Sequence, residues 1–105
     1  MSSPLDEDAR ALGRERALAA RRERASIKRE LREGSLSPAE VLARRMDDPV
    51  VSRMKVTDLL ESLPGIGPAR AAQVLDRCHI SPTRRLRGLG DHQAAALVEC
   101  IGGRP

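Results

Sequence analysis

Two stretches of the sequence have the residue types and spacing to bind phosphate groups. In the first, Gly65-Ile66-Gly67 separates two segments whose apolar residues recur at helical spacing, and Pro68 suits the first position of the second helix. The unpaired N–H groups and positive dipole end of a helix start attract an anion, and Arg70 would add its charge. We expect both glycines to take positive φ in this turn.

The second stretch lies between a Ser-Pro pair at 81–82 and the glycine at 88, and three of its residues are arginines. We expect a short helical turn that begins at this pair and turns Leu86 toward the core. The arginines would then lie outside, beside a glycine-flanked turn that permits close approach. Guanidinium groups are weakly hydrated and fit a narrow, electronegative minor groove. The three residues are Arg84, Arg85 and Arg87.

Helices must position both stretches, because the composition disfavours a sheet. The 105 residues include no Phe, Tyr or Trp, so the core must consist of aliphatic side chains that suit packed helices. Domains that bind single strands or RNA by stacking bases on aromatic rings are disfavoured for the same reason. We expect an all-α protein with one small domain and an appendage.

The appendage is predicted over residues 1–34 as one long Ala/Arg-rich helix that ends at Gly34. Its apolar stripe is short, with Ala17, Ala20, Ile27 and Leu31, so only the second half can dock on a core. The first half is either a solvated, frayed helix or an arm that orders against a duplex. Its candidate contact residues are Arg14, Arg21, Arg22, Arg24, Lys28 and Arg29.

Residues 35–105 are predicted to form a compact helical DNA-binding domain. Ser37-Pro38-Ala39-Glu40 is a capping box, and Asp48-Pro49 repeats the combination of cap and proline. A last helix is expected from Asp91 to Ile101, and its acidic start would repel a phosphate. Arg44 and Arg45 are expected as a solvated pair, with a DNA contact as the alternative.

The net charge of +4 and the pI near 10.0 are compatible with a polyanionic partner. Cys78 and Cys100 occupy apolar helix positions, which predicts buried free thiols. A metal site formed by these residues with His79 and His92 matches no usual ligand spacing, so no metal or cofactor is expected. Because no signal peptide or membrane-length apolar run is present, we expect a cytoplasmic protein without membrane contact.

The sequence resembles the actinobacterial integration host factor from about Ala19 to Gly102. The resemblance is carried by Met54-Lys55-Val56, by residues 59–67, by Arg70-Ala71 and above all by residues 82–91. It implies an all-helical fold with a helix-two-turn-helix, a helix-hairpin-helix-like unit that is shared with a small-subunit ribosomal protein. It also implies a nucleoid-associated protein that binds duplex DNA with little sequence preference, bends or compacts the chromosome, and in some members assists a phage integrase.

Two departures from the family pattern concern affinity. Members usually have a basic residue in place of Pro68, and more basic residues in the last helix in place of His92, Ala94 and Ala95. DNA binding is therefore expected to be weaker, and the integrase role is less secure. The predicted DNA-binding residues are the minor-groove arginines Arg84, Arg85 and Arg87, the hairpin residues Gly65, Gly67 and Arg70, and Lys55, Arg21, Arg22, Arg24 and Lys28.

Three other functions compete with this one. A DNA glycosylase is disfavoured because the sequence has no nucleophile beside a base and too little chain for a base-flipping pocket. We therefore expect no enzymatic activity. RNA binding, suggested by the ribosomal likeness, is the principal alternative, and a protein-interaction adaptor is the third. The chain is expected to act in the nucleoid as a monomer.

Overall fold

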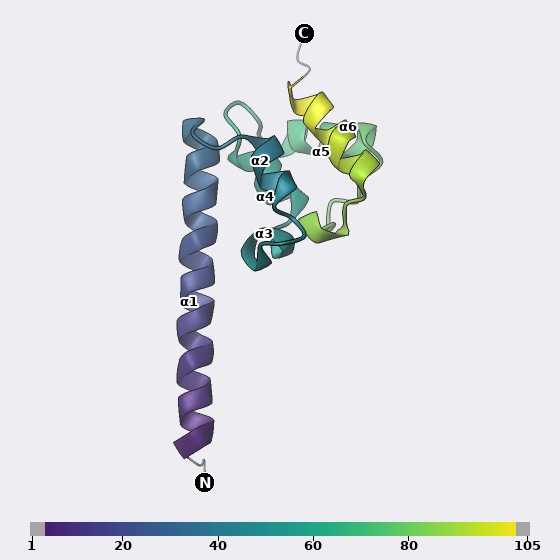
Figure 1. The fold of residues 1–105 in the computed structure, drawn as a ribbon. Helices are drawn as coiled ribbons and strands as arrows, with labels where there is room; N and C mark the ends of the chain where they lie inside the picture. The colour runs from purple at the N-terminus through teal and green to yellow at the C-terminus, as the bar shows by residue number, and fades with distance from the viewer. Residues whose placement is uncertain (1–3, 103–105) are drawn as a thin grey trace.

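The computed structural model describes residues 4–102, with side chains from Asp6 onward, and its regular elements there are all helical. A long helix stands beside a small domain of short helices (Figure 1), which confirms the predicted all-α class. None of the described helices is long and apolar enough to span a membrane. The elements are α1 (Pro4–Glu33), α2 (Pro38–Ala43), α3 (Pro49–Arg53), α4 (Val56–Ser62), α5 (Pro68–Arg77), the 3₁₀ turn η1 (Leu86–Gly88) and α6 (Asp91–Gly102).

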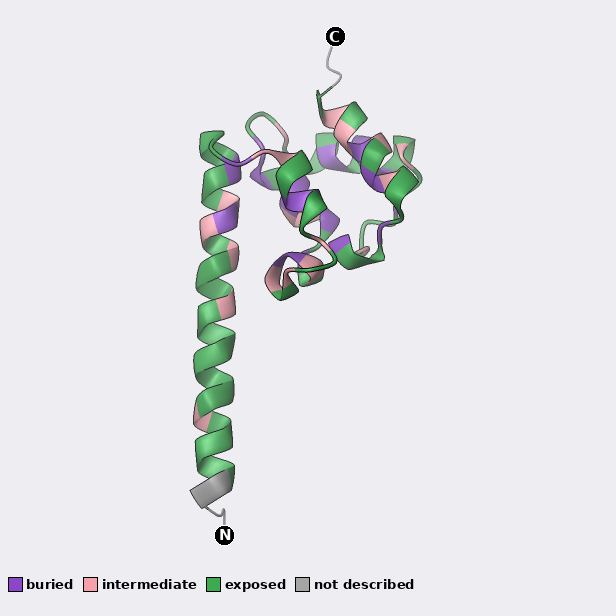
Figure 2. Cartoon of the chain, in the orientation of Figure 1, coloured by how far each residue is buried: buried purple, intermediate pink, exposed green. Residues whose placement is uncertain are grey.

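Only the C-terminal part of α1 packs on the domain, as its short apolar stripe predicted. Ile27 and Leu31 are buried, whereas the N-terminal half of the helix is almost entirely exposed (Figure 2). Ala17 was expected in the stripe and is exposed, because α3 and α4 reach only the last turns of α1. The helix ends at Glu33, and the following Gly34 has a φ of 83°, the left-handed conformation typical of a helix C-terminus.

The two short helices α2 and α3 begin as their sequences predicted. The Ser37 side chain accepts a hydrogen bond from the N–H of Glu40, and the Glu40 carboxylate accepts from the N–H of Ser37. Asp48 caps α3 by accepting from the N–H groups of Val50 and Val51. Both helix starts are therefore capped by the side chain of the residue before the helix.

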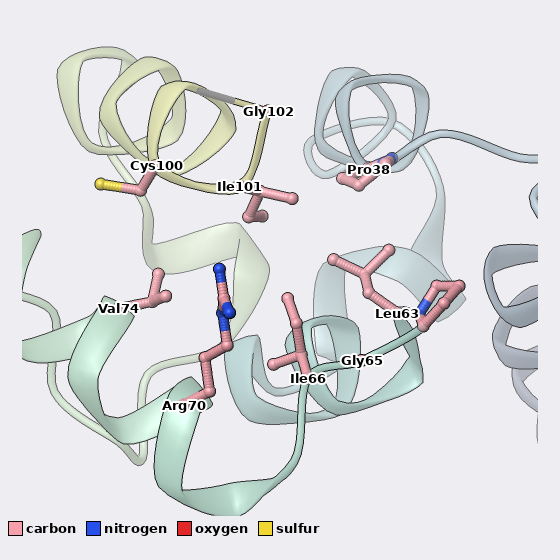
Figure 3. A pocket seen from close by; sticks show the side chains of 10 residues that line it. Pro38, Leu63, Gly65, Ile66, Arg70, Val74, Cys100, Ile101 and Gly102 are labelled. Carbon is pink, nitrogen blue, oxygen red and sulfur yellow. The ribbon is translucent and has the colours of Figure 1, made fainter. Parts of the chain in front are cut away.

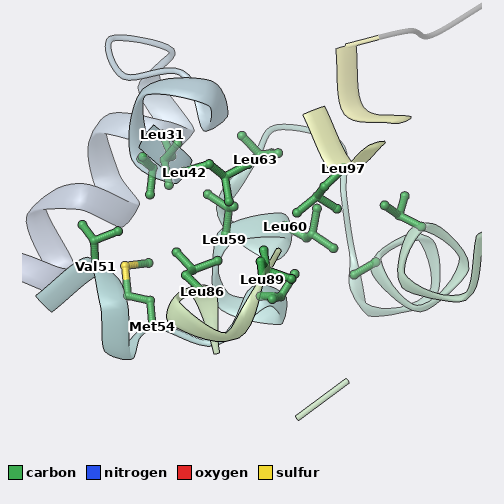
Figure 4. Packing of buried hydrophobic residues seen from close by; sticks show 14 of the residues in the cluster. Leu31, Leu42, Val51, Met54, Leu59, Leu60, Leu63, Leu86, Leu89 and Leu97 are labelled. Carbon is green, nitrogen blue, oxygen red and sulfur yellow. The ribbon is translucent and has the colours of Figure 1, made fainter. Parts of the chain in front are cut away.

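Helix α4 forms the centre of the core. Val56, Leu59 and Leu60 are fully buried in it, because other helices cover them on several sides. Figure 4 shows Leu31 and Leu42 on one side of Leu59 and Leu97 on the other. The core is thus aliphatic, and α4 fixes the spacing between the segments that precede and follow it. The division of the chain at residue 34 stays a prediction.

Candidate nucleic-acid interface

The hairpin turn, residues 63–68, connects α4 to α5. The N–H of Ile66 donates to the carbonyl of Leu63 at 3.2 Å, and Gly65 has a φ of 79°. With Pro64 before it, this is the pattern of a type II turn, which requires positive φ at its third residue. The same expectation for Gly67 is wrong. Its φ is −93° with ψ of −176°, an extended conformation that any residue adopts.

The start of α5 offers N–H groups without partners. Gly67 has no side chain to cap the helix, and Pro68, at the first position, has no N–H. Within residues 4–102 the N–H groups of Ala69 and Arg70 form no hydrogen bond. The first turn of α5 also contains no acidic residue. In contrast to α2 and α3, this helix start can accept an anion.

The side chain of Arg70, the third residue of α5, points away from the helix axis. Figure 3 shows its guanidinium directed into a hollow of about 390 Å³ between the hairpin turn, α5 and the end of α6. The side chain is exposed, and it forms no hydrogen bond or ion pair within residues 4–102. Its predicted role beside the phosphate stays a prediction.

The arginine segment, residues 81–88, is pinned to the chain just before α4. The N–H of Val56 donates to the carbonyl of Arg84 at 3.0 Å, and the N–H of Leu86 donates to the carbonyl of Met54 at 2.8 Å. These bonds form an antiparallel bridge that places Lys55 directly opposite Arg85. The segment is therefore held at the N-terminal end of α4.

The segment differs from the expected single helical turn. A turn closed by the Arg84 N–H and the Ser81 carbonyl comes first, Arg85 is extended, and the 3₁₀ turn begins only at Leu86. The reason is the bridge to residues 54–56, which requires extended backbone at Arg85. Leu86 is fully buried as predicted. The fold thus fixes the segment by its backbone and by this one apolar anchor.

The three arginines are held differently. Arg84 is half-buried rather than outside, and its Nη1 donates to the carbonyl of Gly88 at 2.8 Å. A Cβ at Gly88 would lie 2.8 Å from the Cδ of Arg84, so this glycine makes room for the arginine stem. Arg85 donates to the carbonyl of Arg53. Arg87 is exposed, and its side chain forms no hydrogen bond within the described chain.

These residues form a basic cluster without countercharge. None of its members forms an ion pair with another residue in the range 4–102. Like charges directly opposite across a bridge, as at Lys55 and Arg85, destabilise the pairing. Sequence reasoning missed Arg53, although it stands two positions before Lys55. The basic cluster consists of Arg53, Lys55, Arg84, Arg85 and Arg87.

Helix α1 brings further basic residues toward the same end of α4. The Nζ of Lys28 lies 3.7 Å from the Oδ1 of Asp58, in the first turn of α4. Lys28 is therefore partly neutralised, which its predicted role did not include. Closer to the N-terminus of α1, Arg21 and Arg22 are exposed and Arg24 is half-buried.

The start of α6 is less suited to an anion than that of α5, because Asp91 occupies its first turn. Arg45 donates to a carboxylate oxygen of Asp91 at 2.7 Å and to the carbonyls of Leu42 and Leu89. Its side chain is only 12% exposed, so the expected solvation of Arg45 is wrong, whereas Arg44 is exposed as expected. The Gln93 side chain accepts a hydrogen bond from the N–H of Gly90 at 3.2 Å. Within residues 4–102 the N–H groups of His92 and Gln93 form no hydrogen bond, so the Asp91 carboxylate is what distinguishes this helix start from that of α5.

The two cysteines are half-buried rather than buried, and their sulfurs lie 3.3 Å apart. Within residues 4–102 no group of three or more His, Cys, Asp or Glu residues is placed to hold a metal ion. The thiols therefore face each other rather than a ligand set.

Comparison with known proteins identifies the family. The model of the family described as "S13-like H2TH domain" matches residues 31–101. A protein named integration host factor from Streptomyces coelicolor is 48% identical over 94% of this chain and 92% of its own length. The protein of that name from Mycobacterium tuberculosis is 45% identical over 93% of each chain.

A solved structure, titled "Structure of sIHF bound to an 8bp palindromic DNA", has 49% sequence identity to this chain and a TM-score of 0.77. It covers 79% of this chain and 93% of its own. The family match over residues 31–101 includes both the hairpin turn and the arginine segment. The chain belongs to the actinobacterial integration host factor family.

Proposed function

We propose that this protein is a nucleoid-associated protein that binds double-stranded DNA with little sequence specificity. The observation that carries the proposal is the basic cluster, in which Lys55 and Arg85 face each other without a countercharge. A polyanion would relieve that repulsion. The relative whose title records bound DNA supports the same assignment.

The two candidate sites are spaced to contact one duplex. The arginine segment is attached at the N-terminal end of α4, and the hairpin turn follows its C-terminal end. A helix of this length spans about 10 Å at about 1.5 Å per residue. That distance corresponds to about three base pairs, since phosphates along one strand are about 3.4 Å apart in axial rise. A phosphate at the start of α5 and a groove contact by the arginines are thus compatible.

The residue types of the basic cluster favour shape over sequence recognition. The segments that carry the cluster, residues 53–55 and 81–88, contain no Asn or Gln, the amide side chains that pair with adenine in the major groove. Arginine prefers a narrow minor groove, so A·T-rich or easily bent sites are expected to bind better. DNA bending or compaction follows in this proposal from the same contacts.

Helix α1 extends the basic surface beyond the domain. The molecule measures 61 × 26 × 24 Å, and the long dimension follows α1 (Figure 1). Arg21, Arg22 and Arg24 would contact phosphates outside the main site, and the exposed half would gain helical order on DNA. A phage integrase is the candidate protein partner in site-specific recombination. Because one chain carries both sites, we propose that a monomer binds, in the cytoplasmic nucleoid and without enzymatic activity.

RNA binding is the second candidate, and the S13-like family description favours it. Competition between duplex DNA and duplex RNA for the protein, measured across salt concentrations, separates the two. We expect DNA to compete better, because the wide, shallow minor groove of RNA suits these arginines poorly. With ~5 phosphates neutralised, the log–log salt slope should be about −4 to −5. Preference for RNA, or a flat salt response, would overturn the proposal.

A further inference from the structure

The Cys78 and Cys100 thiols meet although 22 positions separate them. Cys78 follows the last residue of α5, and Cys100 lies in the last turn of α6. Their sulfurs are 3.3 Å apart, a contact in which either thiol can donate. Figure 3 shows the sulfur of Cys100 directed away from Pro38 and out of the hollow. The sequence contains two cysteines, so an intramolecular disulfide can join only this pair.

The fold holds Cys78 in place. Its N–H donates to the carbonyl of Val74 at 3.0 Å. The next residue, His79, has a φ of 56°, and its N–H donates to the carbonyl of Asp76. The N–H of Ile80 donates to the carbonyl of Leu75. This is a Schellman motif, and the buried Ile80 anchors it. The contact between the sulfurs is thus imposed by the packing of α5 on α6.

We propose that Cys78 and Cys100 form a reversible disulfide when a small-molecule disulfide oxidises them, and that this bond closes the loop carrying the arginine segment. The sulfurs need to approach to about 2.05 Å, a movement that side-chain rotation can supply. The closed loop, residues 78–100, contains Arg84, Arg85 and Arg87. Oxidation would therefore restrict the part of the chain that we propose to contact DNA.

The reaction transfers two electrons and two protons to the oxidant. One cysteine, as thiolate, attacks the small disulfide and displaces its first half, which takes up a proton as a free thiol. The resulting mixed disulfide is attacked by the second cysteine, which displaces the other half as a second thiol. The two S–H bonds of the protein are replaced by one S–S bond, and the oxidant is reduced to two thiols.

The local environment of Cys78 favours a disulfide that forms slowly and is reduced slowly. Burial, followed by the hydrogen bond and charge of Cys100, raises the pKa of Cys78 to about 11, although Arg77 opposes the shift. Cys78 is therefore protonated at neutral pH, and the reduced pair is not stabilised as a thiolate. Reduction by attack on Cys100 is slow, because it must release Cys78 as a thiolate whose raised pKa makes it a poor leaving group.

The full-length protein treated with oxidised glutathione tests this inference. Intact mass should show the loss of two hydrogens, with a monomer on a non-reducing gel. The melting temperature should rise by at least about 10 °C and return after reduction, because the bond constrains the unfolded chain. Amide exchange within residues 81–90 should slow at the same time.

The Cys78→Ser and Cys100→Ser variants are the matched controls, and each should only accept a glutathione on its remaining thiol. The double variant should show no response to the oxidant. The inference is overturned if the wild-type protein retains glutathione adducts, forms linked dimers, or loses two hydrogens without a rise in melting temperature. None of these outcomes depends on whether the protein binds DNA.

Discussion

Helices α5 and α6 both follow a Gly-X-Gly sequence, yet their starts differ in what they can bind. The start of α5 has no side-chain cap and no acidic residue. The start of α6 has Asp91, which Arg45 holds, and a side chain from Gln93 bonded to Gly90. The same local pattern therefore favours an anion only at α5, because the carboxylate of Asp91 in the first turn of α6 opposes a second negative charge.

The difference also separates two kinds of contact. At α5 the backbone would bind a phosphate, whereas near α6 the arginine side chains that precede the helix carry the positive charge. The first site depends on a turn of fixed geometry, and the second depends on side chains held by Gly88 and Arg53. Variants can therefore remove each contact separately.

The largest effect is expected from changing Arg84, Arg85 and Arg87 together to Ala. Each lost phosphate or groove contact costs on the order of 1 kcal/mol, so affinity for a duplex should fall at least about tenfold. The melting temperature should fall only modestly, because the Gly88 and Arg53 carbonyls lose their arginine donors at exposed positions and the charge of Arg87 contributes little to stability. Titration of a labelled duplex and a thermal melt provide the two readouts.

A control with the same loss of charge distinguishes placement from net charge. Arg32, Arg44 and Arg77 are exposed and lie outside the basic cluster. Their combined change to Ala should weaken binding much less than the first variant does. Equal losses in both triple variants would contradict a localised site.

The second effect concerns the role of Arg45 at α6. Arg45→Ala removes the side-chain donor from the Leu89 carbonyl, while Leu42 keeps its backbone donors, and should lower the free energy of unfolding by about 1–3 kcal/mol. Asp91→Ala removes a carboxylate that is 99% exposed, so its melting temperature should stay close to that of the parent. Urea denaturation of both variants checks this. An equal loss of stability would mean that the ion pair, rather than the carbonyl contacts, holds α6.

The smallest effects on stability and DNA affinity are expected at the two hairpin glycines, Gly65 and Gly67, whose backbone conformations differ. Gly65→Ala places a side chain at positive φ and should cost about 1–2 kcal/mol of stability. Gly67→Ala causes no such strain, and its Cβ would meet no atom within 4 Å. It should therefore keep the melting temperature and reduce DNA affinity severalfold, by obstructing the approach of a phosphate. If Gly67→Ala binds as tightly as the parent, the phosphate does not sit at this turn.

Local features of the sequence predicted most of the fold. The lack of aromatic residues indicated a helical core. The caps at Ser37 and Asp48 and the apolar spacing of α4 involve residues that are close in the sequence, so they could be predicted without the structure. Arg45 and Gly67 were assigned wrongly because their surroundings come from α6 and from the extended approach to α5. Both the contact of Cys78 with Cys100 and the position of Lys55 opposite Arg85 result from tertiary packing, which spacing along the chain does not show.

The most direct test of the central claim follows backbone amide resonances while a short DNA duplex is added. The account predicts large shifts at Ala69 and Arg70 and across residues 84–88, with small shifts at His92 and Gln93 at the start of α6. Raising the salt concentration should reverse all of the large shifts together, because one duplex occupies both sites. Large shifts at the start of α6, with none at Ala69 and Arg70, would contradict the account.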